Sequence, residues 1–149
     1  MFLTIEDYKA VVDNNTLDVI NQSDPANLAR AESYAIDEIK SYLRAVKPSK
    51  TGIRAYDVET AFAKQDAERN KQLVMYACDI ALYHLIAWLP KRIGFEIREL
   101  RYKRAIEWLE SVQAGNVLLD IPLIDDSETD DNTGSSTRWG SMQKNQYDY

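Results

Sequence analysis

The side chains best suited to chemistry lie in one apolar stretch, where Asp79 is followed five residues later by His84, the single histidine of the chain. A triad of aspartate, histidine and a nucleophile would have to use His84, because no other imidazole could act as the base. The neighbouring residues are apolar, which favours a hydrogen-bonded or interface histidine over a catalytic base. We therefore expect no catalytic residue, and a small helical enzyme around Asp79 and His84 remains an alternative.

Asp79 is the most unusual polar residue of this stretch. A carboxylate that is buried must be paired with a base or protonated, since an isolated buried charge is very costly. We expect its partner to come from a later helix that carries Arg101 and Arg104. A structural ion pair is favoured over a catalytic carboxylate.

Other patterns typical of enzymes and metal sites are missing from the sequence. One histidine cannot supply the two Glu-x-x-His pairs of a di-iron bundle. Cys78 is the only cysteine, so a disulfide or a multi-cysteine metal site within the chain is impossible, and a reducing compartment would suit it. Neither GxxxxGK[ST] nor GxGxxG occurs. We expect no metal, no cofactor and no enzymatic activity.

The composition is typical of a soluble globular protein, with 45% hydrophobic and 28% charged residues. The net charge of -6 lies mainly in the last thirty residues, where seven acids face only Arg138 and Lys144. The preceding 119 residues are nearly neutral, with 17 acids and 16 bases. This balance argues against a protein that holds nucleic acid by neutralising its phosphates.

Basic side chains do concentrate in one segment, from Lys91 to Arg104. Its members are Lys91, Arg92, Arg98, Arg101, Lys103 and Arg104. A solvated face or a subunit contact is favoured, because few aromatic residues that could stack on bases are interleaved with them. A helical nucleic-acid-binding or regulatory module that uses this segment remains a second alternative.

The element that must position Asp79 and His84 is the stretch from Leu73 to Leu89, which is apolar on every side of a helical wheel. Such a helix is buried. A membrane span is the weaker interpretation, because the stretch is barely long enough and Asp79 would lie in hydrocarbon. We expect this to be the central helix of a bundle, ended by Pro90.

Three further helices are expected around it. A short one begins after Thr4, a possible N-cap, and stops near Asp13. A long amphipathic helix begins at Pro25 and ends before Pro48. A last helix, from about Glu96 to Ala114, carries apolar side chains and is stopped by Gly115. Its apolar residues are Ile97, Leu100, Ala105, Trp108, Leu109 and Val112. The pattern predicts a small all-α bundle of about four helices.

The connection from Lys47 to Asp66 is unusually long for a compact domain. It carries apolar and aromatic residues that would be poorly placed in solvent. These are Ile53, Tyr56, Val58 and Phe62. We expect part of this connection to pack on the domain or on a neighbouring subunit.

The composition changes again near the C-terminus. We divide the chain into a helical domain, residues 1–119, and an acidic tail, residues 120–149, whose polar composition cannot offset the cost of ordering the chain alone. The tail nevertheless ends with large side chains that bind well when a partner offers a pocket. These are Trp139, Met142, Tyr147 and Tyr149. We expect the tail to become ordered on a partner.

The order and spacing of five segments resemble the Mu-like phage neck proteins, the head-to-tail connector (adaptor) family. The segments read FLTIEDYKAVV, AESYAIDEIKSYLRAV, RAYDVETAF, VMYACDIALYHLIAW and RYKRAIEWLESVQAGNV. The most specific part is CDIALYHL followed by the last of these. The resemblance covers Phe2 to Pro122. The region from Lys47 to Gly52 and the long acidic tail depart from the family pattern.

The resemblance implies an all-helical adaptor that assembles as a ring beneath the portal, typically in twelve copies. Such a ring extends the DNA channel and offers its lower face to the stopper or tail proteins, while a C-terminal segment docks on the portal. The portal contacts would fall on the four large tail residues named above. Contacts between subunits or to the stopper would fall on Arg54, Tyr56, Val58 and Phe62.

The same resemblance places the protein in the neck of the virion, after assembly in the cytoplasm of the host bacterium. DNA would pass through the channel without specific binding, and no membrane partner is expected. A closed ring repeats one heterologous contact until the rotation closes.

Overall fold

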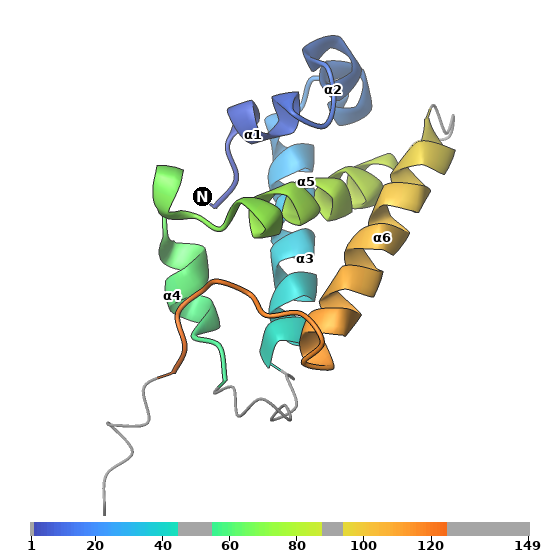
Figure 1. Ribbon diagram of the computed structural model, residues 1–149. Helices are drawn as coiled ribbons and strands as arrows, with labels where there is room; N and C mark the ends of the chain where they lie inside the picture. Colours follow the sequence, from blue (N-terminus) through green and yellow to red (C-terminus); the bar gives the residue numbers. More distant parts are fainter. Residues whose placement is uncertain (1, 45–54, 88–93, 125–149) are drawn as a thin grey trace, which may run out of the picture.

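The computed structural model describes residues 2–44, 55–87 and 94–124, and these ranges are mainly helical (Figure 1). The helices are α1 (Ile5–Lys9), α2 (Asn14–Asn21), α3 (Pro25–Arg44), α4 (Val58–Ala63), the short 3-10 helix η1 (Asp66–Glu68), α5 (Lys71–Ile86) and α6 (Phe95–Gln113). The expected all-α fold is confirmed for these residues, which contain one isolated β-bridge and no strand. None of the helices described is both long and apolar enough to cross a membrane.

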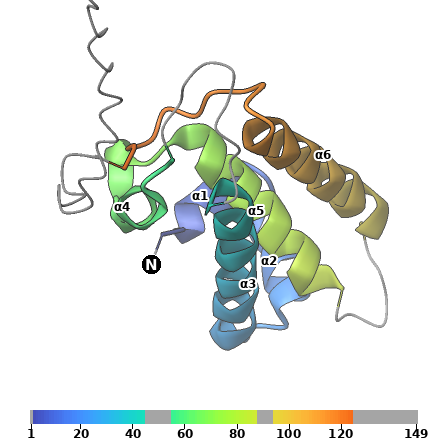
Figure 2. The same cartoon turned by 90° about the horizontal axis from the view of Figure 1, so that it is seen from below.

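Helix α5 lies at the centre of the bundle, in contact with both α3 and α6 (Figures 1 and 2). It begins at Lys71 because Asn70 caps it, with the side-chain Oδ1 accepting a hydrogen bond from the Leu73 amide at 3.0 Å. Its residues from Tyr76 to Leu82 are all buried. The expected buried central helix is therefore confirmed. Its expected last residues, 88 to 90, lie outside the described part of the chain.

Helices α3 and α6 also begin and end close to the expected positions. At the start of α3, Asp24 Oδ1 accepts a hydrogen bond from the Ala26 amide at 2.9 Å, and Pro25 occupies the first helical position. After α6, Gly115 adopts a left-handed conformation with φ of +76°. The Asn116 amide then donates to the Ser111 carbonyl at 2.9 Å, which closes the helix end.

Two short α-helices were not expected. Asp13 caps α2 by accepting from the Thr16 amide at 2.9 Å, and Asp57 caps α4 by accepting from the Thr60 amide at 3.0 Å. The connection from Lys47 to Asp66 thus packs on the domain in its described part, as expected, but that part also contains the unexpected α4. Each of these helices is too short for an apolar periodicity to reveal it.

The chain after α6 returns across the bundle to α4, as the orange trace in Figure 1 shows. Leu123 forms an antiparallel bridge with Tyr56, and the Ile124 amide donates to the Ala55 carbonyl at 2.8 Å. The Leu119 amide donates to the Tyr56 hydroxyl at 2.9 Å. Residues 120–124, which the expected division assigns to the tail, therefore lie on the helical domain.

Candidate interaction surface

A groove between α5 and α6 exposes large apolar side chains on the outside of the bundle. The exposed fraction is 39% for Met75, 52% for Ile97 and 64% for Leu100. The groove has a volume of about 280 Å³. Its walls are Met75, Tyr76, Asp79, Ile97, Leu100, Arg101 and Arg104. Large apolar side chains gathered on an open surface are typical of sites that bind another protein.

The exposure of Ile97 and Leu100 corrects the simplest interpretation of the α6 pattern. The buried side of this helix is formed by Ala105, Leu109 and Val112, which face the core. Ile97 and Leu100 lie in the first half of α6 and remain uncovered. Helical spacing alone shows which residues share a face and does not show what covers that face.

A second hollow, of about 270 Å³, adjoins this groove. Met75 and Arg101 line both hollows, and the second also takes in Ala10 and Val11 near α1 together with Lys71 at the start of α5. The two hollows thus form one concave surface that runs from α1 across α5 to α6. We use the name α5/α6 groove for the first hollow only.

An ion pair forms the floor of the α5/α6 groove. The Nε of Arg101 donates to Oδ1 of Asp79 at 2.7 Å. The side chain of Asp79 is 5% exposed and that of Arg101 is 33% exposed. Burial raises the pKa of Asp79, although the hydrogen bond from Arg101 and the positive charges of Arg98 and Arg104 oppose this rise. Of the two expected partners, Arg101 forms the ion pair.

The rest of the basic segment is engaged mainly within the domain. Arg98 is buried, and its Nη1 donates to the Val11 carbonyl at 3.1 Å. Lys103 pairs with Glu99 at 2.8 Å, and neither residue lines the groove. Arg104 is exposed and makes no ion pair with any residue that the structure describes. Residues Lys91 and Arg92 lie outside the described ranges.

His84 lies in a half-buried cluster of polar and aromatic side chains. Its Nε2 is 2.8 Å from Oε2 of Glu38, and the Tyr102 hydroxyl donates to Oε1 of the same carboxylate at 2.7 Å. The ring of Tyr102 stacks on that of Tyr83 with centroids 4.1 Å apart. Burial alone would raise the pKa of Glu38, but the hydrogen bonds from His84 and Tyr102 hold it below its usual value. His84 thus has a polar partner on α3.

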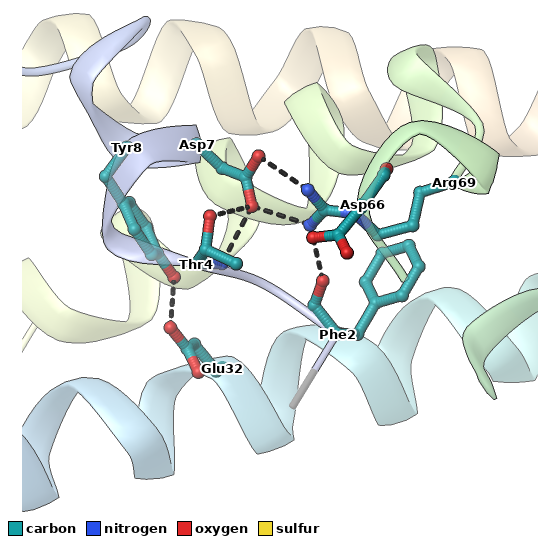
Figure 3. A network of polar contacts seen from close by, with 7 residues as sticks. All are labelled: Phe2, Thr4, Asp7, Tyr8, Glu32, Asp66 and Arg69. Atoms are coloured by element: carbon teal, nitrogen blue, oxygen red, sulfur yellow. Dashed lines mark hydrogen bonds and ion pairs between the residues drawn. The ribbon is translucent and has the colours of Figure 1, made fainter. Parts of the chain in front are cut away.

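A second polar network joins the N-terminal segment to the start of α5, as Figure 3 shows. Arg69 donates to Asp7 through Nη1 at 2.6 Å and through Nη2 at 3.1 Å, and Nη1 also donates to the Phe2 carbonyl at 2.6 Å. The Thr4 amide and hydroxyl donate to Oδ2 of Asp7 at 2.7 and 2.8 Å. Asp7 therefore accepts a hydrogen bond from the amide of the N-cap residue Thr4 at the start of α1 and also binds Arg69.

Close to this network, the Tyr8 hydroxyl donates to Oε1 of Glu32 at 3.0 Å in the core (Figure 3). Oε2 of Glu32 has no hydrogen-bond partner among the described residues. Burial raises the pKa of the Glu32 carboxyl. Neither this pair nor the pair of Asp7 and Arg69 was expected, because the partners are too far apart in sequence for any local pattern to connect them.

The residues expected to contact partners have different positions. Tyr56 and Val58 are buried in the core of their own chain, which explains their apolar character without a neighbouring subunit. Phe62 is half-buried, and the centroid of its ring is 4.6 Å from that of the Phe2 ring. The other residues of this expected set lie outside the described ranges. They are Arg54, Trp139, Met142, Tyr147 and Tyr149.

The metal-binding potential of the surface is also limited. Within the part of the chain that the structure describes, no group of three or more His, Cys, Asp or Glu side chains is placed to hold a metal ion. The thiol of Cys78 is buried in α5, and burial raises its pKa. The α5/α6 groove, in contrast, combines exposed apolar side chains with basic ones.

Comparison with known protein families gives a match over most of the chain. The family described as "Bacteriophage Mu, Gp36" matches residues 3–138, which include every α-helix that the structure describes and reach into the acidic tail. Comparison with curated proteins and with solved structures gives no match.

Proposed function

Because the chain belongs to the bacteriophage Mu Gp36 family, we propose that it is a structural protein of the virion. In this proposal it is a head-to-tail connector that forms a ring beneath the portal, extends the DNA channel and joins the capsid to the tail. The observation that carries the proposal is the family match, which covers residues 3–138.

The surface of the domain supports an assembling protein. The α5/α6 groove leaves Met75, Ile97 and Leu100 exposed beside a filled core. Such a patch costs solubility in a free monomer and gains free energy when another chain covers it. A ring needs two different patches per subunit, since the contact between neighbours is heterologous. The groove supplies one of them.

The proposed partners are further copies of this chain, in a ring of typically twelve, the portal on one side and the stopper or tail proteins on the other. Contacts in this assembly would come from the large side chains of the tail, from Arg54 and from the half-buried Phe62. DNA would slide through the ring without specific binding, because a chain with a net charge of -6 repels phosphates overall.

The two alternatives receive less support. Asp79 and His84 are held by Arg101 and Glu38, so each polar side chain has a structural partner. Arg98 and Lys103 of the basic segment are likewise engaged within the domain. An assembly role accounts for the exposed apolar residues, which neither a catalytic centre around His84 nor a phosphate-binding face requires.

The test is electron microscopy of the full-length chain, purified with and without the portal protein of the same phage. We expect an added ring of density beneath the portal only when both proteins are present. The portal alone is the control. A chain that stays separate from the portal, and instead binds DNA with a strong dependence on salt, would refute the connector role and favour the nucleic-acid-binding alternative.

A further inference from the structure

We propose that the α5/α6 groove binds the acidic C-terminal tail, residues 125–149, of a second copy of this chain. This inference rests on the proposed ring and deepens it, because it names the two surfaces that meet between neighbouring subunits. Each subunit would offer its groove to one neighbour and its tail to the other.

The groove has the chemistry of a receptor for an acidic segment with large apolar side chains. Its apolar walls are exposed, as described above, and its charge is positive. Arg98, Arg101 and Arg104 lie near a single carboxylate, that of Asp79, whose pKa all three affect. Arg101 is already paired with that carboxylate, which leaves Arg104 as the exposed cation on the groove wall. A negatively charged partner would complement it.

The tail has the matching chemistry. Residues 125–149 contain six acids against Arg138 and Lys144, and five of these acids fall within residues 125–131. Trp139 and Met142 follow shortly after this acidic run. Large aromatic and thioether side chains are common anchors in protein interfaces, where they fill apolar pockets. The acids would face Arg104 while Trp139 or Met142 would fill the space between Ile97 and Leu100.

The position of the tail's origin favours a neighbouring copy over the tail's own groove. Ile124 lies beside Ala55, just before α4. The orange segment after α6 thus ends on the opposite side of the domain from the start of α6 (Figure 1). The fifteen residues from Ile124 to Trp139 can reach at most about 50 Å, while a domain of this size is about 35 Å wide. A tail that returned to its own groove would have to wrap around the domain. A tail that extends outward meets the next copy and makes the heterologous contact that a ring repeats.

Photo-crosslinking between isotopically distinct copies tests the contact directly. A photoreactive phenylalanine analogue replaces the exposed Leu100 in a full-length copy of natural isotope composition. This copy is mixed with an equal amount of the unmodified full-length chain labelled with ¹⁵N. The mixture is irradiated once without the portal protein and once with it. We expect mass spectrometry to find crosslinks from position 100 to residues 139–149 of the ¹⁵N copy.

A matched pair of charge reversals tests the chemistry of the contact. Arg104→Glu lies on the groove wall, and we expect at least a tenfold loss of this crosslink. Lys103→Glu makes the same charge change at the neighbouring position, which does not line the groove, and we expect the crosslink yield to stay within about twofold. Replacing Asp130 and Asp131 by lysine in the ¹⁵N copy should restore the crosslink from position 100 of a copy that carries Arg104→Glu. Circular dichroism of each variant confirms that the helices are retained.

The proposal is overturned by crosslinks that join position 100 only to the tail of its own copy, by crosslinks to the portal alone, or by no crosslink at all. An equal loss of crosslink yield in Arg104→Glu and Lys103→Glu would also overturn the proposal. A chain that joins the portal without the crosslink would refute this inference and leave the connector role standing. A chain that forms the crosslink but never joins the portal would refute the connector role and leave this contact between copies standing.

Discussion

Arg69 and Asp7 form a two-pronged ion pair, with both terminal nitrogens of the guanidinium donating to the two carboxylate oxygens at 2.6 and 3.1 Å. The same guanidinium donates to the Phe2 carbonyl and so fixes the segment that leads into α1. Because Ala10 and Val11 follow α1 and line the hollow next to the α5/α6 groove, this ion pair positions one wall of the concave surface.

The pH dependence of stability provides a test of this ion pair. Burial raises the pKa of Asp7, but the hydrogen bonds from Arg69 and Thr4 outweigh it and hold the pKa below the usual 3.8. A carboxylate whose folded-state pKa is lowered stabilises the fold above its unfolded pKa, and this stabilisation is lost as the pH falls through the folded value. We expect Asp7→Asn to lower the free energy of unfolding by about 1–2 kcal/mol at pH 7.

The difference between wild type and Asp7→Asn should shrink as the pH falls below 3.8, where Asp7 becomes protonated in both states of the wild type. Urea unfolding at several pH values measures it. The exposed Asp18, replaced in the same way, is the control and should change stability little at any pH. A difference that stays constant down to pH 2 would show that the carboxylate charge of Asp7 does not stabilise the fold.

Asp79→Ala tests the ion pair under the groove. Removing Asp79 leaves the Arg101 guanidinium without its partner, and because Arg101 is one-third exposed, water compensates part of the loss. We expect a destabilisation of about 2 kcal/mol, below the range for a fully buried pair. Glu99→Ala breaks the exposed pair with Lys103 and should cost under about 0.5 kcal/mol. Equal effects of the two variants in chemical unfolding would contradict this description of the groove floor.

Tyr8→Phe tests the buried pair with Glu32. The tyrosine hydroxyl is the single hydrogen-bond donor to this carboxylate among the described residues, so its loss leaves both carboxylate oxygens without a partner. We expect a loss of about 1–3 kcal/mol in the free energy of unfolding. Tyr34→Phe, at a half-exposed ring on α3, is the matched control. A Tyr8→Phe variant as stable as the control would show that Glu32 is satisfied in another way.

Tyr56→Phe tests the attachment of the segment after α6. The Tyr56 hydroxyl accepts a hydrogen bond from the Leu119 amide, and this bond is lost in the variant. The β-bridge between Tyr56 and Leu123 uses only the backbone and should persist. We expect hydrogen exchange at the Leu119 amide to become at least tenfold faster, with the Ile124 amide much less affected. NMR exchange measurements give both rates in one sample. Equal acceleration at both amides would mean that the whole segment detaches together.

The three long helices could be predicted from the sequence, because each has a strong local signal. The helix α5 is apolar on every side, α3 has Pro25 at its start and a regular apolar spacing, and α6 has Gly115 just after its end. The short α4 was missed because six residues span less than two turns and show no periodicity. Its cap, Asp57, was the one local sign of it.

The candidate surface could be predicted only in part. The pairing of Asp79 with a base from α6 followed from the cost of a buried charge. The exposure of Ile97 and Leu100 could not be foreseen, since helical spacing does not show which neighbouring element covers a given face. The contact of Arg69 with Asp7 joins residues 62 positions apart and leaves no trace in local spacing.

The bridge between Tyr56 and Leu123 has a mechanical consequence. Any pull on residues beyond Ile124 is first borne by the Ile124 to Ala55 hydrogen bond and by the bond from the Asp57 amide to the Pro122 carbonyl, before tension reaches α6. The load therefore enters the domain beside α4, and α6 is shielded from unwinding while those two bonds hold. An anchor of this kind lets the end of the chain bear tension without disturbing α6, which forms one wall of the α5/α6 groove.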